Sequence, residues 1–297
     1  MHVLFGYDGS ARAEEARDLL AHLELPAGTV ITAVTVLQPR SALFELEMVP
    51  LDPAEAEARL VDELLDELRT ATRAFEAPGR RVEHLILRGR PAGAIIAEAR
   101  ARAVDLIVIG SRGRGPFQSM LLGSVSTEVV HGAHCPVFVA RSGGLRRVLF
   151  ATDGSPASAP ALEMLATSPL FQHLPIHVVS VSEPLFSLIA ADPGFVSSKL
   201  IEMELEAADQ RLAARSEIAR TAAERLAAAG RVATWAVRTG NPPEEILAAA
   251  KEAEADLIVT GSHRDAGSFP RTLGSVARNV LQHAHVSVLV TRSRSAT

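Results

Sequence analysis

The stretch Val3–Ser10 reads VLFGYDGS and joins a short apolar run to an acidic turn. The same pattern returns 145 positions later as VLFATDGS at Val148–Ser155. Further along the chain, Asp105–Val108 (DLIV) recurs as Asp256–Val259, now 151 positions later. Matches at two constant offsets are the signature of an internal repeat. We therefore interpret the chain as a tandem duplication with six extra residues in the second copy.

Other residues keep the same two offsets. The first offset relates Pro39 to Pro184, and the second relates three further pairs: Gly123–Val125 with Gly274–Val276, His134 with His285, and Arg141 with Arg292. The junction is Arg141–Leu145 (RSGGL), a short glycine-containing linker that follows an apolar run. We therefore predict two domains, residues 1–142 and residues 146–297, which we call the first and the second repeat.

Length and composition agree with this division and exclude several classes of protein. The 297 residues are twice a typical domain, and 47% hydrophobic with 22% charged residues describes a globular chain. The first 143 positions hold 15 basic and 19 acidic residues and the rest hold 15 and 16, so neither half is a basic nucleic-acid module. A single cysteine, Cys135, excludes an internal disulfide and a multi-cysteine zinc site. With no leader-like segment and no membrane-length apolar run, we expect a cytoplasmic protein that binds neither nucleic acid nor membrane.

Short apolar runs alternate with amphipathic segments in each repeat. In the first repeat we expect strands at His2–Tyr7, Val30–Leu37, Val82–Arg88, Asp105–Gly110 and Val137–Arg141. Between them we expect helices at Ala11–Glu24, Pro53–Glu76, Pro91–Arg102 and Ser124–Gly132, and in the second repeat a long helix at Ser198–Ala229. Unbroken aliphatic strands suit a parallel sheet that is covered on both faces. The fold class is therefore α/β, with two doubly wound, five-stranded parallel domains of the flavodoxin or Rossmann-like kind.

Lysine is scarce in this chain, and its scarcity restricts how a phosphate could be held. Only Lys199 and Lys251 are lysines among the 30 basic residues. A Walker A loop needs Gly-Lys followed by Ser or Thr, and neither lysine stands in that setting. Any nucleotide must therefore be held in another way.

The expected end of the fourth strand carries the features of an anion site. Open α/β sheets bind ligands at the carboxyl ends of their strands, and Asp8 and Gly110 stand at two such ends. Glycines at 110, 113 and 123 allow close backbone approach, and we expect Ser124 to cap a helix whose N-terminus favours phosphate. An ordinary glycine-containing surface loop with a capped helix explains the same residues equally well.

The pattern Gly110-x2-Gly113-x9-Gly123-Ser124 resembles the ATP-binding signature of universal stress proteins. The similarity extends to Asp8-Gly9-Ser10, to the Gly89-Arg90-Pro91 turn and to His134–Val137, and it spans both repeats. The resemblance implies ATP as the cofactor, with Mg²⁺ as an optional companion of the nucleotide. In the first repeat it implies the following nucleotide-binding residues: Asp8, Val36, Gly110, Ser111, Gly113, Gly123, Ser124 and Ser126.

The second repeat departs from this signature. Its corresponding residues are Asp153, Val181, Gly261, Gly274 and Ser275, but Arg264 replaces the second motif glycine. A side chain there either obstructs the approach of the backbone to phosphate or offers a guanidinium to it. Ser126 also corresponds to Ala277, which lacks the hydroxyl group. We therefore expect nucleotide in the first repeat and weaker, altered or absent binding in the second.

Other constellations favour structural over chemical roles. His131, His134 and Cys135 are close in sequence, as are His283 and His285, but no carboxylate pair stands near to complete a metal site, so we expect no metal. Neither a Gly-x-Ser-x-Gly motif nor a nucleophile–base pair at readable spacing occurs, so we expect no catalytic residues.

Three functions remain open from the sequence. The leading hypothesis is a stress-response or signalling protein in which ATP, by ordering the loop Ser111–Leu122, changes conformation or the binding of unknown protein partners. The alternatives are a slow ATP hydrolase and a nucleotide-free scaffold. The resemblance also implies pairing of last strands across a two-fold axis, which this chain could satisfy internally as a pseudo-dimer; a homodimer of the whole chain stays open.

Overall fold

The structure is a computed structural model, and it describes residues 1–38, 53–113, 122–184, 198–262 and 273–292. Each repeat alternates strands with helices, which confirms the predicted α/β class. The first repeat consists of β1 (His2–Gly6), α1 (Ala11–His22), β2 (Val30–Leu37), α3 (Pro53–Thr72), the 3-10 turn η1 (Arg73–Phe75), β3 (Arg81–Arg88), α4 (Pro91–Ala101), β4 (Leu106–Gly110), α5 (Ser124–Gly132) and β5 (Val137–Ala140). The second consists of β6 (Val148–Ala151), α6 (Ala159–Thr167), the 3-10 turn η2 (Pro169–Phe171), β7 (Ile176–Ser182), α7 (Ser198–Ala228), β8 (Ala233–Thr239), α8 (Pro242–Glu252), β9 (Leu257–Gly261), α9 (Ser275–His283) and β10 (Ser287–Thr291).

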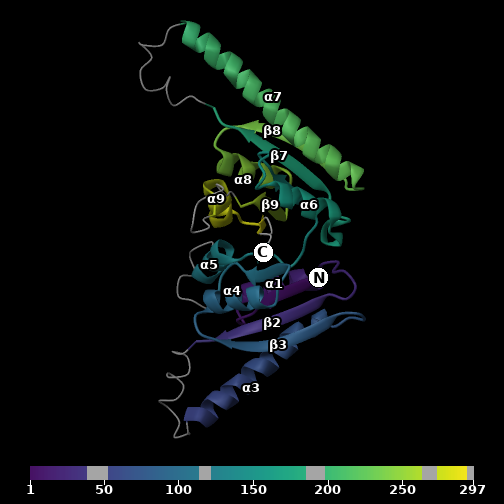
Figure 1. The fold of residues 1–297 in the computed structure, drawn as a ribbon, viewed down its shortest axis with the longest axis vertical. Coiled ribbons are helices and arrows are strands. Elements are labelled where there is room, and N and C mark those ends of the chain that lie inside the picture. Colours follow the sequence, from purple (N-terminus) through teal and green to yellow (C-terminus); the bar gives the residue numbers. More distant parts are fainter. Residues whose placement is uncertain (39–52, 114–121, 185–197, 263–272, 293–297) are drawn as a thin grey trace.

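The described strands form one continuous sheet of ten strands, in the order β3-β2-β1-β4-β5-β10-β9-β6-β7-β8. Within each repeat all strand pairs are parallel, as expected for βαβ units. The repeats meet where β5 pairs with β10 in antiparallel register, with Phe138 opposite Leu289. The two five-stranded sheets predicted from the sequence are therefore halves of one sheet. Figure 1 shows the repeats stacked along the long axis of the molecule, with α3 and α7 towards its two ends.

Two hydrophobic layers cover the faces of the sheet. Alternate residues of a strand point to opposite faces, so Phe5 packs in one layer and Leu4 in the other. The first layer holds buried residues of α1, α3, α6 and α7, and the second holds those of α4, α5, α8 and α9. The strands are buried on both faces, which explains why they read as unbroken aliphatic runs.

Two equivalent arginines connect the repeats across the central strand pair. Arg141 follows β5, is 8% exposed, and donates through Nη2 to the carbonyl of Leu281 at 2.6 Å, in the last turn of α9. Arg292 follows β10, is 3% exposed, and donates to the carbonyls of Val130 and His131 in the last turn of α5. Carbonyl groups at a helix C-terminus lack partners within the helix and favour a cation. Each repeat therefore supplies the arginine that caps the last helix of the other.

Candidate functional site

The carboxyl ends of β1 and β4 meet at the point where the strand order of the first repeat changes direction. From β1 the chain continues to β2 on one side of the sheet and returns through β4 on the other. Such a switch point leaves a crevice beyond the strand ends, because the two following loops diverge to opposite faces. Asp8 follows β1 and Gly110 ends β4, so both predicted residues lie at this edge.

The turn after β1 is held by its own side chains. Asp8 is exposed, and its Oδ1 accepts a hydrogen bond from the Ser10 N–H at 3.1 Å. Gly9 lies at φ 68°, a left-handed conformation that side chains other than glycine rarely adopt. Ser10 caps α1 by accepting from the Ala13 N–H at 3.2 Å, and its hydroxyl donates to the Arg112 carbonyl at 3.2 Å. Ser10, which sequence reasoning left without a role, therefore connects the turn at Asp8 to the segment Ser111–Gly113 that follows β4, which we call the glycine loop.

The two motif glycines at the end of β4 have different neighbours. A Cβ atom on Gly110 would lie 2.6 Å from the carbonyl carbon and oxygen of Arg12 and 2.9 Å from the Ala13 nitrogen. All of these are backbone atoms of α1, so glycine at 110 permits the helix to pack against the strand end. A Cβ atom on Gly113 would instead collide with Oδ2 of Asp8. Gly113 therefore brings loop backbone directly beside the carboxylate.

The beginning of α5 corrects one expectation from the sequence. Ser124 is the first residue of α5, and the N-cap is Gly123, with an extended backbone at φ −81° and ψ 159°. The Gly123 N–H donates to the Ser111 carbonyl at 2.8 Å, and its own carbonyl accepts from the Thr127 N–H at 3.0 Å. Gly123 has no side chain that could accept from the N-terminal N–H groups of α5, and within the described residues no side-chain cap is found there.

Ser111 and Ser126, the other serines predicted to bind nucleotide in the first repeat, are buried at the end of β4. Ser126 is 3% exposed, and its hydroxyl lies 2.9 Å from the Gly110 carbonyl and 3.1 Å from the Ser111 carbonyl. Ser111 is buried, and its N–H donates to the Ala140 carbonyl at 3.0 Å. Both residues therefore hold the backbone of the glycine loop in place.

Val36 lies near the end of β2, two residues after the Val34 carbonyl that accepts the Tyr7 N–H at 2.9 Å. Its side chain is half-buried against the layer that contains α4 and α5. Asp8, Gly113 and Gly123 thus surround the strand ends, with Val36 on the neighbouring strand. Residues 114–121 lie outside the described part of the chain, so the predicted ordering of the loop Ser111–Leu122 by ATP stays a prediction.

The corresponding turn of the second repeat has the same local geometry and lies against α7. Ser155 N–H donates to Oδ1 of Asp153 at 2.9 Å, and Gly154 lies at φ 76°. From α7, Ile218 carbon atoms would lie 2.9 to 3.2 Å from a Cβ on Gly154, and Arg215 donates to the Asp153 carbonyl at 2.9 Å. Burial by itself raises the pKa of Asp153, but hydrogen bonds from Ser155 and the charge of Arg215 outweigh it, and the pKa lies below its ordinary value. Side chains of α7 thus lie over this turn.

Other motif residues of the second repeat keep their structural places. A Cβ on Gly261 would collide with the backbone of Ala157, as at Gly110. Gly274 caps α9 and Ser275 begins it, while Val181 lies in β7. Ala277 is buried where Ser126 stands in the first repeat. Arg264 lies outside the described residues.

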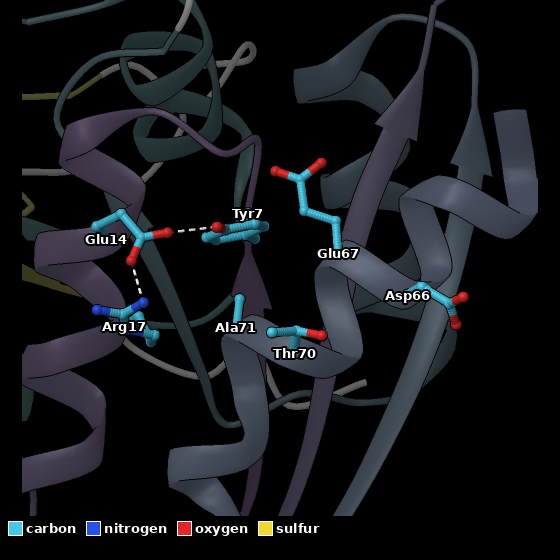
Figure 2. Close-up of a pocket in the computed structure, with 7 residues that line it drawn as sticks. All are labelled: Tyr7, Glu14, Arg17, Asp66, Glu67, Thr70 and Ala71. Carbon is cyan, nitrogen blue, oxygen red and sulfur yellow. Dashed lines mark hydrogen bonds and ion pairs between the residues drawn. The ribbon is translucent and has the colours of Figure 1, made fainter.

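A hollow of about 410 Å³ opens beside Tyr7, on the face of the sheet that α1 and α3 cover. Figure 2 shows the Tyr7 hydroxyl directed at Glu14 and Arg17 beside it, with Glu67 extending from α3. The Tyr7 hydroxyl donates to Glu14, and Glu14 also pairs with Arg17. Burial, the hydrogen bond to Glu14 and its charge raise the pKa of Tyr7 well above its ordinary value. Sequence reasoning missed this cluster because its members come from three separate elements.

The histidines considered as metal ligands have other neighbours. Nδ1 of His131 lies 2.7 Å from the Thr127 carbonyl, and Nδ1 of His283 lies 2.9 Å from the Asn279 carbonyl. Cys135 is buried in the layer beneath α4 and α5. Among the residues that the structure describes, no group of three or more His, Cys, Asp or Glu side chains could hold a metal ion. In the same part of the chain, no helix is long and apolar enough to cross a membrane.

Comparisons with known proteins agree in one family. The sequence model described as "Universal stress protein family" matches residues 1–141 and again residues 144–292. Universal stress protein MJ0531 of Methanocaldococcus jannaschii is 37% identical over 107 residues, which cover 34% of this chain and 63% of that protein. A universal stress protein of Thermus aquaticus is 33% identical over 139 residues, covering 47% of this chain and 97% of that protein.

Solved structures support the same fold over the whole chain. The crystal structure of a universal stress protein from Archaeoglobus fulgidus matches 98% of this chain and 96% of its own, with a TM-score of 0.64 at 23% identity. A structure from Pseudomonas aeruginosa described as a putative universal stress protein matches 99% of this chain and 93% of its own, with a TM-score of 0.57 at 17% identity.

Proposed function

Because the chain belongs to the universal stress protein family, we propose that its first repeat binds an adenine nucleotide, with ATP as the expected ligand. The observation that carries the proposal is the placement of Asp8 beside Gly113 at the switch point of the sheet. A carboxylate there can accept hydrogen bonds from sugar hydroxyl groups, while loop backbone and the N-terminus of α5 can donate to phosphate. The proximity of Asp8, Gly113 and Gly123 at the ends of β1 and β4 supports the proposal.

The phosphate end of this site relies on backbone rather than on a lysine. The first N–H groups of α5 have no side-chain cap, because Gly123 rather than a serine or aspartate holds the N-cap position. They are thus available to an anion, which the partial positive charge of the helix N-terminus also favours. Mg²⁺ could accompany a bound nucleotide, and no residue is proposed as its ligand.

We propose that the second repeat binds nucleotide weakly or not at all. Ile218 and Arg215 of α7 lie against the Asp153–Ser155 turn, where a nucleoside would have to approach. The substitution of Arg264 for the motif glycine acts in the same direction. The two domains, residues 1–142 and residues 146–297, would then differ in role, with the first as the nucleotide-responsive unit.

The proposed biological role is a cytoplasmic stress-response or signalling module whose nucleotide occupancy alters conformation or partner binding. We propose binding rather than catalysis, because the sequence has neither a Gly-x-Ser-x-Gly motif nor a nucleophile–base pair at readable spacing. ATP turnover by the wild-type chain that exceeds that of a Gly113→Arg variant would contradict this choice and favour a slow hydrolase.

The direct test is nucleotide identification by chromatography on freshly purified, denatured protein. The chain has one tryptophan and one tyrosine, so adenine absorbance stands out against a weak protein background. We expect an Asp8→Asn variant to lose most of the bound nucleotide and the matched Asp153→Asn variant to keep it. Equal loss in both variants would contradict the assignment to the first repeat, and no nucleotide binding by copurification or by ATP titration would refute the proposed function.

A further inference from the structure

The hollow beside Tyr7 is separate from the crevice that Asp8 and Gly113 share. Tyr7 directs its ring to the face of the sheet that α1 and α3 cover, where it packs in the same layer as Phe5, with ring centres 6.0 Å apart. The volume of about 410 Å³ lies within the range of small-molecule pockets, roughly 300 to 1,000 Å³. The hollow is therefore large enough for a small metabolite.

The polar groups of the hollow are held in fixed positions. Glu14 accepts from the Tyr7 hydroxyl and pairs with Arg17. Arg17 in turn donates to Oδ1 of Asp18 at 2.9 and 2.7 Å, so its charge is shared between two carboxylates. Figure 2 shows the Glu67 side chain on the opposite wall, extending from α3 beside the Tyr7 ring. Three carboxylates thus line the hollow from two helices, Glu14 from α1 and Asp66 and Glu67 from α3, together with one guanidinium that is already shared.

The second repeat shows that the fold does not need these polar groups. The buried residues Leu68 of α3 and Phe75 of η1 correspond to Ala219 and Leu226 of α7 at the offset of 151, so Glu67 corresponds to Ile218. At the offset of 145, the counterparts in the second repeat are Thr152 for Tyr7, Ala159 for Glu14 and Leu162 for Arg17.

The second repeat therefore has apolar residues where the first has Glu14, Arg17 and Glu67. Asp66 corresponds to another acid, Glu217, and Tyr7 to the polar Thr152. Ile218 packs on Gly154, and Leu162 packs against the hydrophobic layer. Half-buried ion pairs contribute little more to stability than apolar residues of similar volume, and often less. Since the fold forms with aliphatic side chains at the positions of Glu14, Arg17 and Glu67 in the second repeat, it has no structural need for ionisable side chains there in the first. The polar set of the first repeat points to a ligand.

The composition of the walls defines the chemistry of that ligand. The excess of carboxylate over guanidinium favours a positive charge, and the face of an aromatic ring attracts a cation as well. A divalent metal does not fit, because no group of three or more metal-ligating side chains occurs among the described residues. We propose that the hollow of the first repeat binds a small organic cation, a primary-amine or guanidinium compound, with its charged end between Glu14 and Glu67 and against the Tyr7 ring. This binding does not depend on the nucleotide proposed above.

The chain supplies two built-in reporters for a test. Tyr7 is the only tyrosine, so ring-labelled tyrosine gives a single set of NMR signals from inside the hollow. Trp235 is the only tryptophan and lies 43% exposed on β8, at the far edge of the second repeat. We would titrate the full chain with putrescine and, as a neutral counterpart, with butanediol, at constant ionic strength. We expect a saturable shift of the Tyr7 signals with putrescine only, and no shift of Trp235.

Variants then assign the site. Glu67→Ile, which installs the residue of the second repeat, and Glu67→Gln, which keeps the shape and removes the charge, should each weaken putrescine by about tenfold. The matched Ile218→Glu variant should bind as the wild type does, and an unchanged far-ultraviolet circular dichroism spectrum reports that each variant is folded. The proposal is wrong if putrescine gives no saturable shift of Tyr7 or if butanediol shifts it equally. It is also wrong if Glu67→Gln binds like the wild type, or if Mg²⁺ shifts Tyr7 and putrescine does not.

Discussion

Replacing the two motif glycines at the end of β4 by alanine should separate stability from ligand binding. In Gly110→Ala the new Cβ would lie 2.6 Å from two backbone atoms of Arg12, and backbone cannot rotate away as a side chain can. Helix α1 must shift, and overpacking of this kind costs about 1–3 kcal/mol of unfolding free energy. In Gly113→Ala the only described group that the new Cβ meets is the carboxylate of Asp8, the end of an exposed side chain. We expect that variant to stay within about 0.5 kcal/mol of the wild type.

The two variants should behave in the opposite way towards nucleotide. Displacement of the Asp8 carboxylate removes a charged hydrogen-bond acceptor, which is worth about 1.5–3 kcal/mol, or roughly tenfold to a hundredfold in affinity. Gly113→Ala should therefore bind ATP at least about tenfold more weakly than the wild type, whereas Gly110→Ala, where folded, should keep much of its affinity.

The assay combines urea unfolding followed by circular dichroism with ATP titration of the folded protein. Gly93→Ala is the matched control, since Gly93 lies in α4 and a Cβ there would have no neighbour within 4 Å in the described part of the chain. There alanine should stabilise the protein by about 0.5–1 kcal/mol. An unchanged urea midpoint in Gly110→Ala, or an equal loss of stability in Gly113→Ala, would refute the division of roles between the two glycines.

Three further predictions concern buried and titrating groups. Arg292→Ala should lower the unfolding free energy by about 2–3 kcal/mol, because it leaves carbonyls of α5 without a charged donor. In a thermal unfolding experiment the control Arg100→Ala, at an exposed position, should change it by less than about 0.5 kcal/mol. Burial and Glu14 raise the pKa of Tyr7, so tyrosinate absorbance should appear near pH 10 only in unfolded protein. The contribution of the protonated Tyr7 to stability is full below about pH 10 and is lost as the pH rises further, and a titration of Tyr7 near pH 10 in the native protein would contradict this. Burial and neighbouring arginines lower the pKa values of His84 and His177, so the contribution of the neutral rings to stability is full above about pH 6.5 and is lost as the pH falls through the folded-state pKa values. NMR titration of the two rings would check this, and stability should fall less steeply at acid pH in His177→Gln than in the wild type.

The secondary structure was predictable because it depends on local periodicity. The long helix expected at Ser198–Ala229 is observed at Ser198–Ala228, and the strand expected at Val30–Leu37 has those limits. Boundaries differ by a few residues where a helix ends in a 3-10 turn, as at Arg73–Phe75. The N-cap at Gly123 was missed because the cap depends on a hydrogen bond from Gly123 to Ser111, twelve residues away in the chain.

The site was predictable only in part. The repeat offsets and the family signature identified Asp8 and Gly113, but nothing in the sequence separates the packing role of Gly110 from the position of Gly113 beside the carboxylate. For Ser126, which the resemblance implies as a nucleotide-binding residue, the structure adds hydrogen bonds from its hydroxyl to the carbonyls of Gly110 and Ser111.

By itself the sequence determined that this protein is one α/β domain written twice, since strand and helix patterns and the repeated motifs are local properties of the chain. Tertiary structure alone decided which side chains of the two copies come into contact. It placed Tyr7, Glu14 and Glu67 around one hollow and packed Ile218 against Gly154. It also placed Arg141 and Arg292 so that each caps the last helix of the other repeat. The physical reason is that such contacts join residues from separate helices and strands. Their distances depend on how the layers pack, and no spacing along the chain records them.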